Sequence, residues 1–328
     1  MKYLNVSIAV AGEGKTIPSI ILCLLQAGHR VKSIGGTKKG KALHELAGFS
    51  SVSLDNYQDC QGLPEKENLL DCSLIIIFTP ENPDIKKTWI SRIARIAPEH
   101  ALILVNSESI PLEELQSGLP DPSRLLGLNW VYPAHLTLFA ELLSTPENRE
   151  EEMEALMVLM AKNWGKDPYH LKSGKSIRSK LLAALAREAF FLVDQGYVEV
   201  ADIDRACRND PGYYLPFAGN CRYMDLMGTF IYGVVMKDLN PELSNAMEIP
   251  AYFNKLMDTD TNKSGLGQGF YAHSPATLEK REHSFLEFSR EMSLLMARYP
   301  FPKEDYGEEE EMVPEKDKIG GNINSRKK

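Results

Sequence analysis

The sequence predicts an α/β protein, in which a doubly wound parallel sheet is followed by an all-helical C-terminal domain. Strand and helix patterns alternate through the first half of the chain. The segment LIIIFT at 74–79 is apolar throughout, as strands buried on both faces of a parallel sheet are. Strand patterns stop near residue 173. Such a series predicts an open sheet with helices on both faces.

The first half supports this prediction segment by segment. Residues 5–10 are apolar and rich in strand formers, and the glycine-containing AGEG breaks the strand directly after them. Residues 17–27 carry apolar side chains at helical spacing and are followed by a glycine, a common helix stop. The later segments continue the alternation, with strands expected at 29–34, 74–79, 101–105 and 125–131 and helices at 41–47, 84–96 and 150–163.

The second half contains only helical patterns, at residues 176–197, 200–207, 224–239 and 276–297. We therefore divide the chain into a sheet domain at 1–172, a helical domain at 173–302 and a tail at 303–328. The tail is charged, contains the run EEEE and is poor in aromatic residues. We expect it to be disordered, with a solvated acidic run.

Composition narrows the classes of function. A formal charge of −8 argues against nucleic acid or an anionic membrane as the main partner. The longest apolar runs fall far short of the ~20 residues that a membrane span needs. The five cysteines are scattered and none has CxxC spacing, which indicates reduced thiols in a cytoplasmic protein and no metal site.

A glycine turn, AGEGKTI at 11–17, follows the first strand and opens the first helix. Gly12 permits a tight turn, and Gly14 lets a pyrophosphate approach the backbone at the helix N-terminus, where N–H groups are free. The turn therefore predicts a Rossmann-type dinucleotide site with Gly12 and Gly14 among its contacts.

Two features of this turn depart from the usual motif. Ile17 occupies the third glycine position, which keeps the helix further from the strand. Glu13 adds a negative charge beside the expected phosphates, and Lys15 and Thr16 partly offset it.

The end of the second strand bears on the choice between NAD and NADP. NAD sites place Asp or Glu there to hold the ribose hydroxyls, but this chain continues as GGTKK at 35–39. Thr37 and Lys38 could receive the 2′-phosphate of NADP, or they could be solvated loop residues. The sequence therefore leaves NAD and NADP as alternative cofactors.

Five motifs, in order, resemble those of the 3-hydroxyacyl-CoA dehydrogenase family. They are PENPDIKK at 80–87, VNSESIPLEEL at 105–115, GLNWVYPAHLTLFAEL at 127–142, GYVEVADIDRACR at 196–208 and GLGQGFY at 265–271. The resemblance implies an NAD-binding domain, hydride transfer at the cleft between the two domains, and a homodimer formed through the helical domain. The apolar run MDLMGTFIYGVVM at 224–236 suits such an interface, although a core helix would show the same run.

The resemblance also implies roles for single residues. In the family, a His and a Glu twelve residues later move the proton of the 3-hydroxyl group while hydride passes to the nicotinamide. The matching positions here are Asn129 and Glu141, so the Glu is kept and the His is absent. Because Asn does not accept a proton near neutral pH, the resemblance implies altered or lost acid–base chemistry.

Other pocket positions differ from the family as well. Glu108 and Ser179 stand where the family has its substrate-binding Ser and Asn, and Tyr132 replaces the Asn of an Asn-Pro pair. Glu108 would suit a cationic substrate, or it could belong to a helix start. The positions that keep the family's residues are expected on the cofactor side of the cleft and are Glu81, Lys86 and Asn106.

Two residues could replace the missing base. His135 is either a general base or a turn residue at the pocket rim. Tyr132 could donate a proton if a nearby cation lowered its pKa, or it could fill the space beside the small Asn129. Glu141 needs a partner because a buried unpaired carboxylate is unfavourable, and the Asn129 amide is the expected donor.

Two hypotheses about function follow. The first is an NAD(P)-dependent oxidoreductase acting on a 3-hydroxy or 3-oxo small molecule such as an acyl-CoA, with very low standard 3-hydroxyacyl-CoA dehydrogenase activity. The second is a non-catalytic homologue that binds a nucleotide or an acyl-CoA.

Overall fold

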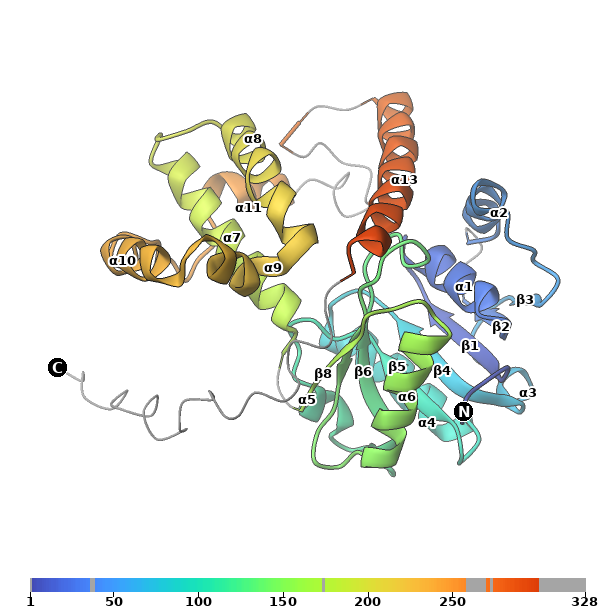
Figure 1. The fold of residues 1–328 in the computed structure, drawn as a ribbon. Coiled ribbons are helices and arrows are strands. Elements are labelled where there is room, and N and C mark those ends of the chain that lie inside the picture. Colours follow the sequence, from blue (N-terminus) through green and yellow to red (C-terminus); the bar gives the residue numbers. More distant parts are fainter. Residues whose placement is uncertain (1, 36–38, 173–174, 258–269, 272–273, 301–328) are drawn as a thin grey trace, which may run out of the picture.

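The computed structural model describes residues 2–35, 39–172, 175–257, 270–271 and 274–300. Within these residues the first half forms one eight-stranded sheet in the order β3-β2-β1-β4-β5-β6-β7-β8 (Figure 1). Its strands are β1 (Ser7–Gly12), β2 (Arg30–Ile34), β3 (Tyr57–Cys60), β4 (Cys72–Phe78), β5 (Leu102–Val105), β6 (Leu125–Asn129), β7 (Glu141–Leu143) and β8 (Tyr169–Leu171).

The sheet is mostly parallel, which confirms the predicted fold class. Strands β1 to β6 pair in parallel with their neighbours. The β6–β7 pair is antiparallel, and β8 runs parallel to β7. The sequence did not predict this reversed edge, which brings the start of β7 directly beside the end of β6.

Helices cover both faces of the sheet. Alternate residues along a strand face opposite sides, and both sides carry apolar residues that pack against helices. Ile8 and Val10 of β1 belong to one core and Ala9 and Ala11 to the other. The first core includes side chains from α1 (Ile17–Gln26), α2 (Lys39–Ser50) and α6 (Glu150–Lys162), and the second includes side chains from α3 (Lys66–Leu69), α4 (Pro83–Ile96) and α5 (Leu112–Gln116). A short 3-10 turn, η1 (Pro122–Arg124), precedes β6.

The regular elements among the described residues of the second half are all helices (Figure 1). A single helix was expected over 224–239, but Gly228, with φ 106°, separates two helices there. Glycine adopts such a left-handed backbone without strain, so the chain turns at this point. The helices are α7 (Ile177–Asp194), α8 (Val200–Asn209), α9 (Pro211–Met227), α10 (Thr229–Leu239), α11 (Ala251–Met257) and α13 (Pro275–Arg298).

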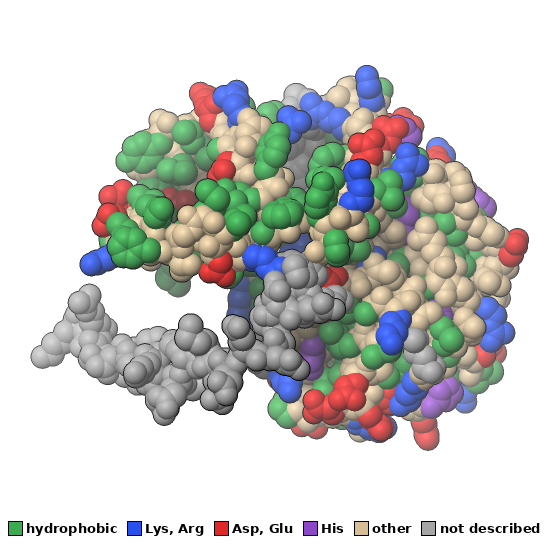
Figure 2. All heavy atoms as spheres, viewed as in Figure 1, with side chains coloured by type: hydrophobic (Ala, Val, Ile, Leu, Met, Phe, Trp, Pro, Cys, Tyr) green, Lys and Arg blue, Asp and Glu red, His purple; other side chains and the backbone are tan. Residues whose placement is uncertain are grey.

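Helices α7 to α10 leave much of their apolar surface exposed. Among their residues only Ala218 is buried. Tyr213 is 80% exposed and Phe230 is 82% exposed. Figure 2 shows hydrophobic side chains gathered over this half of the molecule. Monomeric proteins rarely expose so much contiguous apolar surface.

The described helices include none with the length and apolar character needed to cross a membrane. All five cysteines are free thiols, and Cys23, Cys60 and Cys72 are buried.

Candidate active site

The glycine turn lies between β1 and α1, at the carboxyl end of a strand flanked by β2 and β4. In doubly wound sheets ligands bind at the carboxyl ends of the strands, where the strand order reverses. Gly12 has φ 116°, and a Cβ there would lie 2.0 Å from the carbonyl oxygen of Phe78. Gly14 has φ 136° and lies against the Phe78 ring. Both glycines are therefore required by the backbone itself.

The turn offers donors that fit a diphosphate. The amides of Gly14, Lys15 and Thr16 have no acceptor among the described residues, whereas the Glu13 amide donates to the Phe78 carbonyl at 3.0 Å. These amides precede the first residue of α1, so they lie at the positive end of its dipole. The arrangement suits an anionic ligand. Ile17, at the third motif position, is fully buried in the core.

The region expected to choose between NAD and NADP is only partly described. Strand β2 ends at Ile34, and Gly35 follows with φ 91°. Thr37 and Lys38 lie outside the described residues.

Asn129 and Glu141 face each other across the antiparallel β6–β7 pair. Asn129 is 2% exposed and Glu141 is fully buried. Asn129 Nδ2 donates to Glu141 Oε2 at 2.7 Å and to the Ser107 carbonyl at 2.9 Å, and its Oδ1 accepts from the Ser107 amide at 2.8 Å. The hydrogen bond expected between Asn129 and Glu141 is thus confirmed.

The second oxygen of Glu141 joins the two domains. Its Oε1 accepts from the Tyr169 hydroxyl at 2.8 Å and from the amide of Ile177, the first residue of α7, at 2.9 Å. Burial disfavours the charged carboxylate, but hydrogen bonds from Ser176, Asn129, Tyr169 and Ile177 outweigh burial and lower the pKa of Glu141. The residue is therefore an ionised acceptor at the junction.

Glu108 and Ser179, predicted to contact substrate, meet at the same junction. The Ser179 hydroxyl donates to Glu108 Oε2 at 2.7 Å, and Arg178 Nη1 lies 3.3 Å from the same oxygen. The side chains of Glu108 and Arg178 are 40% and 32% exposed, so both are open to solvent. The Arg178 guanidinium also lies 5.9 Å from the centre of the Phe139 ring. Glu108 and Arg178 are thus solvent-exposed charged groups next in sequence to Ser107 and Ile177, whose backbones contact Asn129 and Glu141.

Lys86 is enclosed rather than open to a ligand. It is fully buried, and its Nζ donates to the carbonyl oxygens of Asn106 at 2.7 Å and Thr79 at 3.3 Å. Its Nζ also lies 3.2 Å from Glu81 Oε2. Burial lowers the pKa of Lys86, and the Glu81 charge opposes that shift. Lys86 therefore ties the ends of β4 and β5 together.

The partly exposed Glu81 and the buried Asn106 hold the neighbouring backbone in place. Glu81 Oε1 accepts from the amides of Glu108, Ser109 and Ile110 at 3.0, 2.7 and 3.1 Å. Asn106 exchanges two hydrogen bonds with the Thr79 backbone. Glu81 thus fixes the loop after β5 through hydrogen bonds to its amides. This loop contains Ser107, which contacts Asn129, and Glu108, which contacts Ser179.

Tyr132 contacts helix α13 rather than the Asn129–Glu141 pair. Its hydroxyl donates to Glu282 Oε1 at 2.7 Å, and its ring stacks on Phe285 with the ring centres 6.4 Å apart. Lys15 Nζ lies 4.9 Å from the centre of the same ring. Burial, reinforced by the hydrogen bond to Glu282, raises the pKa of Tyr132. The hydroxyl is therefore a weaker acid here than a free phenol.

His135 lies against the end of α2. Its Nε2 is 3.0 Å from the Ser50 hydroxyl, and its Nδ1 has no partner among the described residues. Burial, with the charge of Lys166 nearby, lowers the pKa of His135 to about 4. The imidazole is therefore neutral at physiological pH and hydrogen-bonds Ser50 rather than the candidate active-site pair.

Three residues of the site were missed by the sequence analysis. Ser176 caps α7 by accepting from the Ser179 amide at 3.1 Å, a pattern that a serine before a helix can signal. Tyr169 stands on the three-residue strand β8, which has no clear sequence signal. Glu282 lies in a long helix whose charged surface looks like any solvated face.

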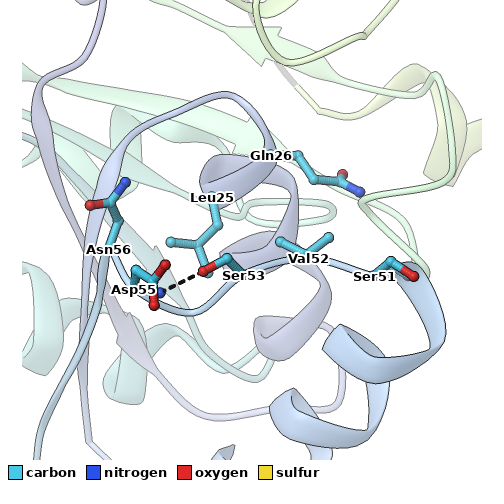
Figure 3. Close-up of a pocket in the computed structure, with 8 residues that line it drawn as sticks. Leu25, Gln26, Ser51, Val52, Ser53, Asp55 and Asn56 are labelled. Atoms are coloured by element: carbon cyan, nitrogen blue, oxygen red, sulfur yellow. Dashed lines mark hydrogen bonds between the residues drawn. The ribbon is translucent and has the colours of Figure 1, made fainter.

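Several cavities formed by the described residues lie away from this site, and two of them border α1 and α13. One, of about 420 Å³, is lined by Leu25, Gln26 and the loop between α2 and β3 (Figure 3). Because α1 starts at the glycine turn and ends at Gln26, this cavity is about 15 Å from the turn along the helix. The other, of about 640 Å³, is mostly apolar and lies between α8, α9 and α13. Within the described residues, no cluster of three or more His, Cys, Asp or Glu side chains could hold a metal ion.

The amino-acid sequence is similar to those of known dehydrogenases and fatty acid oxidation proteins. A 5-formyl-3-hydroxy-2-methylpyridine 4-carboxylate 5-dehydrogenase of Mesorhizobium japonicum is 27% identical over 207 residues, which cover 62% of this chain and 66% of that protein. A fatty acid oxidation complex subunit alpha of Shewanella oneidensis is 24% identical over 217 residues, 66% of this chain and 30% of that protein. The chain thus spans less than two thirds of the length of either relative.

A solved structure shares the fold across nearly the whole chain. It is that of 5-formyl-3-hydroxy-2-methylpyridine 4-carboxylic acid 5-dehydrogenase, an NAD+-dependent dismutase, with a TM-score of 0.74 and 21% identity. The match covers 89% of this chain and 98% of that one.

Two family models match consecutive parts of the chain. The NAD-binding domain of 3-hydroxyacyl-CoA dehydrogenase matches residues 7–174, and the C-terminal domain of the same enzyme matches residues 177–273. The first match alone covers more than half of the chain and includes the glycine turn and the Asn129–Glu141 pair. The chain therefore belongs to the 3-hydroxyacyl-CoA dehydrogenase family.

Proposed function

We propose that this chain binds a nicotinamide dinucleotide at the glycine turn and acts as an NAD(P)-dependent oxidoreductase. The observation that carries the proposal is the turn itself. Gly12 and Gly14 bring the backbone close to Phe78. The amides of Gly14, Lys15 and Thr16, just before α1, donate to no acceptor among the described residues. Such donors at the positive end of a helix suit a diphosphate. When bound, the nicotinamide would accept or donate the hydride.

The substrate we propose is a 3-hydroxy or 3-oxo small molecule, such as an acyl-CoA, at the domain junction. Glu108, Ser179 and Arg178 are the polar groups exposed there, and they would contact and orient it. An acyl-CoA is the substrate that the family name suggests. The relative from Mesorhizobium carries the name of a dehydrogenase for a small pyridine carboxylate, which supports testing compounds without CoA as well.

We propose that acid–base chemistry at this site is altered or lost, because Asn129 stands where the family has a catalytic His. The Asn129 amide cannot hold a proton, and both of its N–H bonds are already directed to Ser107 and Glu141. The charge of Glu141 is likewise held by hydrogen bonds within the protein. Loss of a general base typically lowers a rate by ~10²–10⁴-fold, so standard 3-hydroxyacyl-CoA dehydrogenase activity is expected to be very low.

The hydrogen bonds that Asn129 and Glu141 make within the protein also favour a second candidate function. In this alternative the chain is a non-catalytic homologue that binds a nucleotide or an acyl-CoA. A pair whose N–H groups and carboxylate oxygens have partners within the protein supports the fold whether or not chemistry takes place.

We also propose that the chain forms a homodimer through its helical domain. The support is the exposed apolar surface of α9 and α10, which includes Leu226, Phe230 and Ile231, exposed by 66%, 82% and 62%. Burying such side chains against a second copy would remove their apolar area from water.

A titration with NADH and with NADPH, followed by nicotinamide fluorescence, tests the oxidoreductase proposal. We expect saturable binding of at least one of the two. Tighter binding of NADPH would indicate that Thr37 and Lys38 receive the 2′-phosphate. Binding of neither nucleotide would contradict the oxidoreductase proposal and would leave acyl-CoA binding by the non-catalytic homologue to be tested.

A further inference from the structure

Helix α13 lies beyond residue 273, where the match to the family's C-terminal domain ends. It nevertheless packs onto the NAD-binding domain. Leu286 is 6% exposed and belongs to the core that α1 and α2 share. The ring of His283 meets that of Phe49 edge-on, with the ring centres 5.5 Å apart. Arg290 lies 5.1 Å from the centre of the Phe49 ring. The middle of α13 is therefore packed against this domain.

This packing brings one carboxylate to the glycine turn. Glu282 Oε1 lies 3.1 Å from Lys15 Nζ and accepts the Tyr132 hydroxyl at 2.7 Å. Lys15 is one of the three residues whose amides have no described acceptor. The cation beside the expected diphosphate is thus already paired with an acid from a distant part of the sequence.

We propose that Glu282 is an affinity-setting residue of the dinucleotide site, because its carboxylate holds the lysine that would otherwise pair with the diphosphate. This inference rests on the proposed binding of a nicotinamide dinucleotide at the glycine turn. The carboxylate and the diphosphate carry the same sign of charge and compete for Lys15. Nucleotide binding therefore requires Glu282 to release Lys15 or to remain close to a second anion.

The size of the effect follows from exposure. The side chains of Lys15 and Glu282 are 64% and 40% exposed, so solvent screens their interaction. Exposed ion pairs are weak, and we expect removal of the Glu282 charge to tighten nucleotide binding by about three- to tenfold. A residue that instead accepted hydrogen bonds from the ribose hydroxyls would show the opposite sign, because its removal would weaken binding.

The test is a fluorescence titration with NADH of the wild type, Glu282→Gln, Lys15→Ala and the double variant. Gln keeps the shape of the side chain and still accepts from Tyr132. Glu279→Gln is the matched control, since Glu279 is exposed on the same helix and makes no ion pair or side-chain hydrogen bond with the described residues. Melting temperatures confirm that each variant folds.

We expect Glu282→Gln to lower the Kd for NADH by about three- to tenfold, while Glu279→Gln changes it less than twofold. The gain should shrink at 0.5 M NaCl and should be smaller in the Lys15→Ala background. Unchanged or weaker binding by Glu282→Gln, in a wild type that binds NADH, would overturn this inference and leave the proposed function standing. No binding of NADH or of NADPH by any form, Glu282→Gln included, would overturn both.

Discussion

At the scale of single residues, both N–H groups of the Asn129 side chain are engaged within the protein, so neither is free to bind a substrate. Its Nδ2 donates to Ser107 and Glu141, and its Oδ1 accepts from the Ser107 amide. A buried amide with this many partners is rigid and holds two segments of chain together. The Asn129–Glu141 pair therefore stabilises the site whether or not a proton moves there.

Substitution of Glu141 by Gln should destabilise the protein. An amide NH₂ would replace one acceptor oxygen and would face donors such as Asn129, Tyr169 or the Ile177 amide. Leaving a buried polar group unsatisfied typically costs about 1–3 kcal/mol, which urea unfolding at pH 7 would detect. The same substitution at Glu150, whose side chain is 71% exposed, is the control and should change stability by less than about 0.5 kcal/mol.

The contribution of the Glu141 charge to the free energy of unfolding should decrease as the pH is lowered. Its folded-state pKa lies below the ordinary value of 4.5, so the unfolded state binds its proton first as the pH falls. The stability that the charge contributes is present above pH 4.5 and is lost as the pH falls through the folded-state pKa. The stability difference between wild type and Glu141→Gln should therefore narrow below pH 4.5, and a constant difference would contradict this reading.

His135 should give a second pH dependence at higher pH. Its pKa falls from 6.5 to about 4 on folding, so between these values the unfolded state binds a proton that the folded state does not. Stability should therefore fall as the pH is lowered from 6.5 to 4. Unfolding titrations of His135→Gln should show a flatter profile in this window, with His44→Gln as an exposed control. Equal slopes for wild type and His135→Gln would refute this assignment.

The sequence predicted part of the residue-scale geometry. The twelve-residue spacing of Asn129 and Glu141 was enough to pair them, because the resemblance placed both in one pocket. The contacts to Tyr169 and Ser176 could not be predicted, since they depend on β8 and the start of α7 meeting the same carboxylate. The contact between Glu282 and Lys15 could not be predicted either, because no local sequence pattern connects α13 with the glycine turn.

At the scale of elements, the glycine turn depends on its backbone geometry. Replacing Gly12 by Ala would place a Cβ 2.0 Å from the Phe78 carbonyl oxygen at a φ of 116°. Backbone strain of this kind costs on the order of 1–3 kcal/mol, so we expect a lower melting temperature and NADH binding at least about tenfold weaker. Gly48→Ala is the control, because a Cβ there meets nothing within 4 Å and α2 should be unchanged or slightly stabilised. Normal binding by Gly12→Ala would exclude the turn as the nucleotide site.

The bounds of an element were predicted most accurately where its sequence pattern was strongest. The fully apolar segments that became β4 and β5 were predicted closely, because both faces of these strands are buried. Strand β3 was missed, since two of its four residues are exposed and its pattern resembles a loop. The expected helix at 224–239 was wrong across Gly228, where a glycine within an apolar run ends one helix before the next begins.

At the scale of the whole molecule, the exposed helical domain leads to a prediction about assembly. Phe230 is 82% exposed on α10, and a charge there would oppose burial against a second copy. Sedimentation velocity should show a dimer for the wild type and a shift to monomer for Phe230→Glu. Leu70→Glu replaces a 57% exposed leucine of the sheet domain and should remain dimeric. A monomeric wild type would contradict the dimer proposal.

The general architecture was the most predictable property of the chain. Alternating strand and helix patterns, followed by helices alone, correctly gave a mostly parallel sheet and a helical second half. The arrangement between the halves was not predictable, because it depends on Glu141 capping α7 and on α13 returning to the first domain. Such long-range contacts leave no periodic signal in the sequence.

The most direct test of our central proposal is the rate of NADH-dependent reduction of acetoacetyl-CoA, with an authentic 3-hydroxyacyl-CoA dehydrogenase measured in parallel. We predict a wild-type rate lower by ~10²–10⁴-fold, because Asn129 cannot act as the general acid or base. Asn129→His, assayed alongside, should raise the rate if the site still holds this substrate. A wild-type rate equal to that of the authentic enzyme would contradict the proposal that the acid–base machinery has been altered or lost.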